Sequence, residues 1–302
     1  MAECGRFSSA KNPVTLRRTD PRELCAQQGP PKYRIMELPK MFTRKPVSRP
    51  EVIWVGYTLT WTAGFVDAIA YLTLRQIYVA NMSGNTVAVG IHISVKNWVE
   101  VWAHACPIVT FFPGLIFGAA VVEWTRRSSI RPKIAPAILI EAAILGLFVY
   151  LANQWISQKG TVQSHSGAIY VALTASLAFS MGMQNGLLRH TGTMRDLHTY
   201  VTGTLLAAAN GVTNYLFWVA RRLRRFTHRG FRSVLRYSTH HRSLRGAAIA
   251  GTLWIFYVVG AAVGALTLVH CGINVLIAAP AVLVVVALSD IIKPVPNRPA
   301  AA

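Results

Sequence analysis

The segment Asn81-Met82-Ser83-Gly84-Asn85-Thr86 is a short polar run enclosed by apolar sequence, with 77–80 before it and 87–91 after it. In the hydrocarbon core of a membrane each unsatisfied backbone group costs several kcal/mol, so a polar run at that depth must face protein or a water-filled cavity. Because the rest of the chain predicts membrane helices, this segment is the first candidate for a functional site.

The composition predicts a polytopic membrane protein. Of the 302 residues, 53% are hydrophobic and only 14% are charged, and the mean hydropathy is +0.38. Soluble domains have about 25% charged residues. Several apolar runs approach the ~20 residues that a spanning helix needs. The four cysteines (Cys4, Cys25, Cys106, Cys271) form neither a CxxC pair nor a metal-binding spacing, which indicates free thiols and no metal site.

The net charge of +20 is unevenly distributed and therefore says little about nucleic acid, which we do not expect as a partner. Residues 1–50 are basic and rich in proline, which is typical of a disordered cytoplasmic tail. An alternative is a polybasic arm that touches anionic lipid. Residues 51–292 form the expected transmembrane domain, and 293–302 form a C-terminal tail.

The apolar runs predict an all-α polytopic membrane protein with six to eight transmembrane helices built from two internal repeats, 52–152 and 168–292. Two further apolar elements carry polar interruptions and are candidates for re-entrant or broken helices, 77–95 and 197–220. The remaining expected helices are 52–72, 101–124, 134–152, 168–188, 247–269 and 273–292.

Two acids lie within expected helices, Asp67 in 52–72 and Glu141 in 134–152. An acid inside a span costs about 2.5–3.5 kcal/mol on insertion scales, so each is a functional hypothesis. Asp67 could instead lie near a helix end and face interfacial water or Arg75, and Glu141 could simply face a polar bundle interior.

Two interior loops are strongly basic. The first contains Arg126, Arg127, Arg131 and Lys133, and the second, 221–245, has nine arginines and no acid. The simplest interpretation is a positive-inside loop attracted to anionic lipid headgroups. Alternatives for 221–245 are a helix on the membrane surface or, less well supported, a nucleic-acid contact.

Three sequence landmarks recur in the same order and indicate an internal duplication. Gly64-Phe65-Val66-Asp67 aligns with Gly182-Met183-Gln184-Asn185, and 82–86 aligns with 201–205. The Gly114/Gly118 pair aligns with Gly260/Gly264, if the arginine-rich loop is an insertion. Such GxxxG pairs allow close helix packing, within one chain or in a homo-oligomer.

The basic loops favour one arrangement of this repeat. If both interrupted elements crossed the bilayer, loops 125–133 and 221–245 would lie on opposite sides, against the positive-inside rule. If both enter and return, both basic loops and both termini lie on the cytoplasmic side of the inner (plasma) membrane, and the halves are inverted copies. The length of 197–220 is compatible with crossing, so both arrangements stay open.

The paired motifs predict one polar site. Gly84 and Gly203 permit a tight bend and close backbone approach. Serine, asparagine and threonine side chains nearby can cap a half-helix, whose free N–H groups suit an anion or a substrate carboxylate. The alternative is that these groups only satisfy one another. The candidate substrate-binding residues are Asp67, Asn81, Ser83, Gly84, Asn85, Thr86, Gln184, Asn185, Thr202, Gly203 and Thr204.

At these motifs, Gly64–Ala68, Val79–Thr86, Gly182–Gly186 and Thr199–Thr204, the chain resembles the YoaK-like family of uncharacterised bacterial membrane proteins. The resemblance covers about 52–292 and implies an integral inner-membrane protein of six to eight helices. It supplies no substrate or activity. The chain departs from the family in its long N-terminal tail and its basic loop 221–245.

Three functions compete. The first is a small-solute or ion transporter or channel that uses the paired motifs, without a cofactor. The second is a membrane scaffold that uses 221–245. The third is an intramembrane enzyme with Ser83, or Asp67 with His92 and His104, as its chemistry, but the histidines form no HxxxH pair and no serine–histidine spacing supports it. We therefore expect a non-enzymatic protein.

Overall fold

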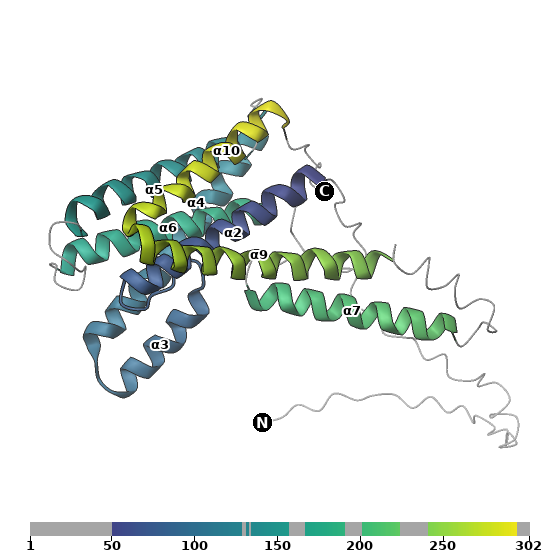
Figure 1. The fold of residues 1–302 in the computed structure, drawn as a ribbon, viewed down its shortest axis with the longest axis horizontal. Coiled ribbons are helices and arrows are strands. Elements are labelled where there is room, and N and C mark those ends of the chain that lie inside the picture. The colour runs from purple at the N-terminus through teal and green to yellow at the C-terminus, as the bar shows by residue number, and fades with distance from the viewer. Residues whose placement is uncertain are drawn as a thin grey trace, which may run out of the picture. The chain divides into compact units, whose positions relative to one another are not determined.

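Helices make up every regular element that the structure describes. It is a computed structural model, and it describes residues 50–128, 131–132, 134–156, 167–190, 201–223 and 241–294 (Figure 1). The expected disordered tail, most of the loop 221–245 and the tail beyond 294 lie outside these residues. The elements are α2 (Pro50–Thr73), α3 (Met82–Ser94), α4 (Trp98–Arg127), α5 (Ala135–Ile156), α6 (Gly167–His190), α7 (Val201–Leu223), α9 (Arg242–Cys271), the 3-10 helix η4 (Ile273–Ile277) and α10 (Ala278–Ile292).

The expected all-α fold is confirmed, and within the described residues five helices are long and apolar enough to cross a membrane. They are α4, α5, α6, α9 and the η4–α10 segment. The 13-residue α3 would be about 20 Å long at 1.5 Å per residue, short of the ~30 Å hydrocarbon core. Neither α7 nor α2 is among the five, and in α2 Asp67 and several threonines lower the hydropathy.

Helix starts differ from the expected ones where a local signal intervenes. The element expected at 77–95 begins as a helix only at Met82, because 77–81 form a non-helical connection. The helix expected from residue 101 already begins at Trp98, where the Asn97 side chain accepts a hydrogen bond from the Glu100 N–H (3.4 Å).

Helices α4 and α6 cross through four glycines that allow backbone contact. A Cβ added at Gly118 would lie 2.1 Å from the carbonyl oxygen of Met183, and one at Gly182 would lie 2.2 Å from that of Phe111. Gly114 and Gly186 are equally close to the facing backbone. Any larger residue at these positions must therefore separate the two helices.

Helices α2 and α9 form a second glycine-lined crossing. A Cβ at Gly64 would lie 2.1 Å from the carbonyl oxygen of Tyr257, and one at Gly260 would lie 2.1 Å from that of Trp61. Gly264 approaches the backbone of Phe65. The first helix of the described chain is thus packed against a helix that begins at Arg242.

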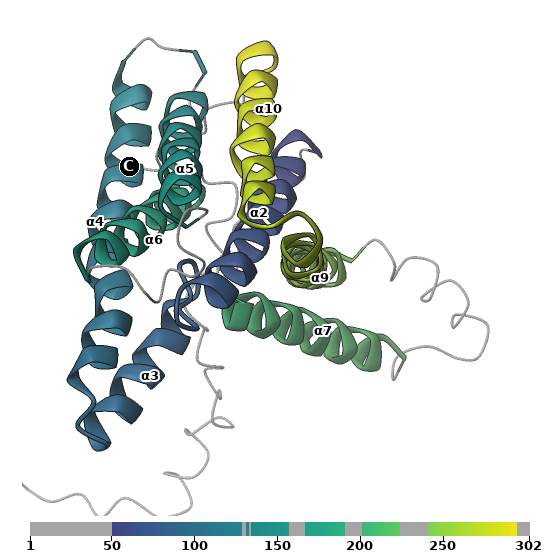
Figure 2. The same ribbon diagram turned by 60° about the vertical axis from the view of Figure 1, so that its left-hand side comes forward.

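The other helices pack around these two crossings. Helix α3 lies along α4, α7 lies beside α9, and α5 packs against α6 and α10 (Figures 1 and 2). At the start of α5, Asp290 Oδ2 of α10 accepts hydrogen bonds from the N–H groups of Ile134 (3.0 Å) and Ala135 (2.9 Å). A buried carboxylate there satisfies amide groups that a helix N-terminus leaves free.

The outer face of α4 is strongly apolar. Trp102 is 73% exposed, and Val109, Phe112 and Ile116 are also exposed on this helix. Exposed Trp98 and Trp124 flank the stretch and stand about 39 Å apart at 1.5 Å per residue. An apolar face bounded by two tryptophans is typical of a helix that crosses a bilayer of ~30 Å hydrocarbon and its interfaces.

Candidate functional site

Asp67 joins three segments at one buried carboxylate. Its Oδ1 accepts hydrogen bonds from the backbone N–H groups of Val79 (2.7 Å) and Ala80 (2.6 Å). Its Oδ2 accepts a hydrogen bond of 2.5 Å from the hydroxyl of Tyr257 in α9. Asp67 is 2% exposed. The carboxylate therefore ties α2 to the connection that precedes α3 and to α9.

The expected role of Gly84 and Gly203 as bend-forming residues is wrong. Gly84 lies in the first turn of α3 and Gly203 in the first turn of α7, both with ordinary helical backbone. The bend after α2 instead falls at Arg75 (φ 45°) and Gln76 (φ 59°). Gly84 serves close approach, since a Cβ there would lie 2.7 Å from Cδ2 of the Tyr78 ring.

Asn85 pins the connection to α3. It is fully buried, and its Oδ1 accepts from the Tyr78 N–H (3.1 Å) while its Nδ2 donates to the Tyr78 carbonyl (2.5 Å). The amide thus replaces both backbone partners of one residue. Its neighbours make local bonds: Ser83 Oγ donates to Asn81 Oδ1 (2.7 Å), and Thr86 Oγ1 donates to the Met82 carbonyl (2.9 Å).

In the second half, α6 presents two buried amides beside Glu141. Gln184 Nε2 donates to Glu141 Oε1 (2.9 Å), and Asn185 Nδ2 donates to the Met181 carbonyl (2.9 Å). Glu141 is 1% exposed, and this bond is the one that the structure records for its side chain within the described residues. A deeply buried acid with so little compensation is well suited to hold a proton or a cation.

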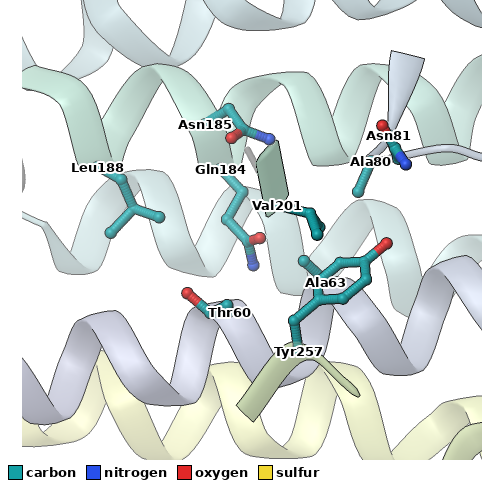
Figure 3. Close-up of a pocket in the computed structure, with 9 residues that line it drawn as sticks. All are labelled: Thr60, Ala63, Ala80, Asn81, Gln184, Asn185, Leu188, Val201 and Tyr257. Carbon is teal, nitrogen blue, oxygen red and sulfur yellow. The ribbon is translucent and has the colours of Figure 1, made fainter. Parts of the chain in front are cut away.

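A small pocket brings segments from both halves together. Its volume, about 20 Å³ of room for the centres of water-sized molecules, accommodates one or two waters or a small ion. In Figure 3, Gln184 extends from α6 toward α2, and the Tyr257 hydroxyl is directed toward Ala80 and Asn81. The lining residues are Thr60, Ala63, Ala80, Asn81, Gln184, Asn185, Leu188, Val201 and Tyr257.

Only some of the candidate residues from the sequence line this pocket. Asn81, Gln184 and Asn185 do, and Asp67 is bonded to the lining Tyr257. From the α7 motif Val201 is a lining residue, whereas Thr202 is exposed and Thr204 is buried with its hydroxyl donating to the Val201 carbonyl (2.8 Å). Besides Asp67, the candidates that are not among the lining residues are Ser83, Gly84, Asn85, Thr86, Thr202, Gly203 and Thr204.

The sequence interpretation missed Thr60 and Tyr257. Thr60 lies two helical turns before Asp67 on α2, so the helical period could have placed both on one face. Tyr257 comes less than one turn before Gly260, which marks the face of α9 that meets α2. Its pairing with Asp67 spans 190 positions, and no local pattern carries that information.

A second group of polar side chains lies between α3 and α4. Ligand-type atoms of His92, Glu100 and His104 all lie within 4.8 Å of one another. His92 and His104 are twelve positions apart, so they form no HxxxH spacing that the sequence would show. The helical hairpin brings them together.

Residues 55–289 match the family described as "Protein of unknown function (DUF1275)". The chain is similar to the UPF0700 transmembrane protein YoaK of Bacillus subtilis (strain 168), with 29% identity over 160 residues, which cover 53% of this chain and 67% of that protein. No solved structure matches the chain. With five helices of spanning length and composition among the described residues, the match indicates a multi-pass membrane protein.

Proposed function

The chain belongs to the DUF1275 family of proteins of unknown function, and from that premise we propose that it is a small-solute or ion transporter or channel, without enzymatic activity. The pocket between α2, α6 and α9 is its binding site. Small ions suit this pocket best, because its volume of about 20 Å³ holds little more than one or two waters.

One observation carries this proposal: two buried acids, Asp67 of α2 and Glu141 of α5, bond to residues that line a single pocket. Asp67 accepts from Tyr257, and Glu141 accepts from Gln184. Acids at membrane depth are rare and commonly belong to ion pathways or proton relays. Their amide and phenol partners place polar atoms at the pocket wall, where an ion that has shed water would need them.

We also infer an internal duplication, which would support a transport function. Exchanging α2 with α6, α3 with α7, α4 with α9 and α5 with the η4–α10 segment carries packed pairs onto packed pairs: α4–α6 becomes α9–α2, and α3–α4 becomes α7–α9. The exchange also carries Gly114 and Gly118 onto Gly260 and Gly264. Transporter folds are often built from two such repeats, with the substrate site at their interface.

The proposed topology has six crossings, by α2, α4, α5, α6, α9 and the η4–α10 segment. Helices α3 and α7 enter without crossing, and α3, with 13 residues, is too short to span the hydrocarbon core. The threonine hydroxyls of α2 bond to carbonyls of their own helix, so this helix tolerates a bilayer. Both basic loops and both termini then lie in the cytoplasm, and the two halves are inverted copies.

Flux through reconstituted vesicles tests the proposal. The full-length chain is placed in phosphatidylethanolamine–phosphatidylglycerol vesicles, and H⁺, Na⁺ and K⁺ uptake is followed with trapped indicator dyes, with vesicle swelling for small neutral solutes. Glu141→Gln keeps an acceptor for Gln184 but removes the charge, and we expect it to lower flux about tenfold, a barrier change of ~1.4 kcal/mol.

Glu123→Gln is the matched control, because Glu123 lies in the last turns of α4 in ion pairs with Arg126 and Arg127 rather than at the pocket. Its flux should equal that of the original chain. Equal flux for Glu141→Gln and Glu123→Gln, or vesicles no more permeable than empty ones to every probe, would contradict the proposal.

Fewer described residues support the alternative that the protein is a membrane scaffold. At the end of α7, Arg222 lies over the ring of Trp218, 5.0 Å from its centroid, and Arg221 and Arg222 are exposed. Such residues suit anionic headgroups at a membrane surface. Replacing the basic residues of 224–240 with glutamine should leave vesicle flux unchanged if the transporter proposal holds.

A further inference from the structure

We propose that the α3–α4 hairpin holds a divalent transition-metal ion, with His92, Glu100 and His104 as ligands. This site is separate from the lining of the pocket and does not depend on the proposed function. Two imidazoles and one carboxylate are a common ligand set for zinc and related ions, which leave a further position for water. Magnesium and calcium prefer oxygen ligands and fit this set poorly.

The ligands come from rigid positions. His92 lies in the last turn of α3, Glu100 in the first turn of α4, and His104 one turn later on the same face of α4. The two helices are joined by the short connection Val95–Asn97, in which Lys96 has a positive φ of 56°. The imidazole rings are stacked, with centroids 5.4 Å apart.

The hydrogen bonds around His104 determine which nitrogen is free. Tyr78 fixes the Asn85 amide, since its N–H donates to Oδ1 and its carbonyl accepts from Nδ2. The His104 Nδ1 lies 3.5 Å from that same Oδ1, which can only accept. Nδ1 therefore carries the proton, and Nε2 keeps a lone pair for a metal ion. Metal-binding histidines are usually oriented by such an outer acceptor.

Glu100 is likewise oriented by an outer hydrogen-bond partner, here Arg75. Its Oε1 accepts from Arg75 Nη1 (3.1 Å), which leaves Oε2 for a metal ion. Both ligands of α4 thus have an outer partner from the segment 75–85. A tetrahedral ion with bonds of about 2.0–2.2 Å separates its ligand atoms by roughly 3.4 Å, so the ligand-type atoms, which lie within 4.8 Å of one another, would have to move closer by at most about 1.4 Å.

The ion would join α3 to α4 at the end away from Asn81. It would also hold His104 against Asn85, and Asn85 fixes Tyr78, next to the Val79 and Ala80 amides that Asp67 binds. Metal occupancy would therefore stabilise the connection that contributes Ala80 and Asn81 to the pocket.

Zinc binding to the full-length chain in detergent tests the site. After treatment with a chelator and its removal, calorimetry with ZnCl₂ should give one ion per chain, and Co²⁺ should give the visible absorption bands of a four-coordinate site. His92→Gln and Glu100→Gln should each weaken zinc binding by about 100-fold or more, beyond the 10–100-fold that outer partners supply.

His270→Gln is the matched control, because His270 is an exposed histidine in the last turn of α9. It should bind zinc like the original chain. Zinc should also raise the melting temperature of the original chain and of His270→Gln, but not that of the two ligand variants. Because the shift is measured within each variant, it reports on this site even if a variant is less stable.

Two results would overturn the proposal. One is equal zinc affinity in His92→Gln, Glu100→Gln and the original chain, which would assign the ion to other histidines. The other is an original chain that binds no zinc at tens of micromolar protein.

Discussion

Single buried side chains hold the connection between α2 and α3, and we expect replacement of Asp67 to destabilise the protein most. Asp67→Ala leaves two buried N–H groups without an acceptor, at about 1–3 kcal/mol each, so we expect the free energy of unfolding to fall by ~3 kcal/mol or more. Tyr257→Phe removes one hydrogen bond and should cost about 1–3 kcal/mol. Denaturant unfolding in micelles measures both changes.

Thr86→Ala is the control for these variants. The sequence interpretation placed Thr86 in the site, but it is exposed and bonds only to the Met82 carbonyl of its own helix. Its change in stability should stay within about 0.5 kcal/mol. The double variant of Asp67→Ala with Tyr257→Phe should be less destabilised than the sum of the singles, and additivity would contradict the pairing.

The sequence alone identifies the polar residues that are unusual for a membrane helix. It does not show whether each of them bonds to the chain's own backbone or lines the pocket. Asp67 and Asn85 were both marked as site residues because polar groups at that depth need partners. Asn85 turned out to bind the backbone of Tyr78, whereas Gln184 faces the pocket. Both are amides in apolar sequence. Only the tertiary structure shows that Asn85 binds backbone groups, while Gln184 lines the pocket and donates to Glu141.

At the scale of the elements, glycines decide which helices touch. Gly260→Ala should reduce the free energy of unfolding by about 1–3 kcal/mol, because the new methyl group would lie 2.1 Å from the Trp61 carbonyl oxygen and force α9 away from α2. Gly251→Ala in the same helix meets nothing within 4 Å and should be neutral or slightly stabilising. Thermal melts of the two variants in detergent give the comparison.

If Gly251→Ala destabilises the protein as much as Gly260→Ala does, the α2–α9 contact is not the cause. The sequence predicted close packing at both GxxxG pairs, and backbone contacts at Gly114, Gly118, Gly260 and Gly264 confirm it. It could not say which helix lies opposite. A GxxxG face requires only a close neighbour, and the pattern is the same for every candidate partner.

At the scale of the whole molecule, the proposed topology places the α3–α4 hairpin and the α4–α5 loop on opposite sides of the membrane. In a chain without native cysteines, Lys96→Cys should react with an impermeant maleimide in intact cells, and Arg131→Cys should react only after permeabilisation. Both positions are exposed, so reactivity reports the side of the membrane. Labelling of both in intact cells would contradict six crossings.

The sequence predicted an all-α membrane protein correctly, because length and hydropathy act locally. Of the six to eight expected transmembrane helices, five among the described residues have the length and composition to span. Bilayer crossing of α2 and α7 is a harder question, since polar residues such as Asp67 and Asn210 lower their hydropathy. The partner of Asp67, Tyr257, lies 190 positions away in the chain. Insertion of such helices is decided by packing, which composition does not record.

The pairing of α2 with α9 has a consequence for biosynthesis. The ribosome releases α2 long before it has made α9, which begins at Arg242. During that interval Asp67 lacks the Tyr257 hydroxyl, and the face of α2 around Gly64 lacks the α9 backbone that covers it. Lipid, the insertion machinery or a chaperone must contact both until α9 is made. Among the described helices, α2 leaves the ribosome first and is thus among the last to reach its native neighbour, so chains released early would be natural targets for membrane quality control.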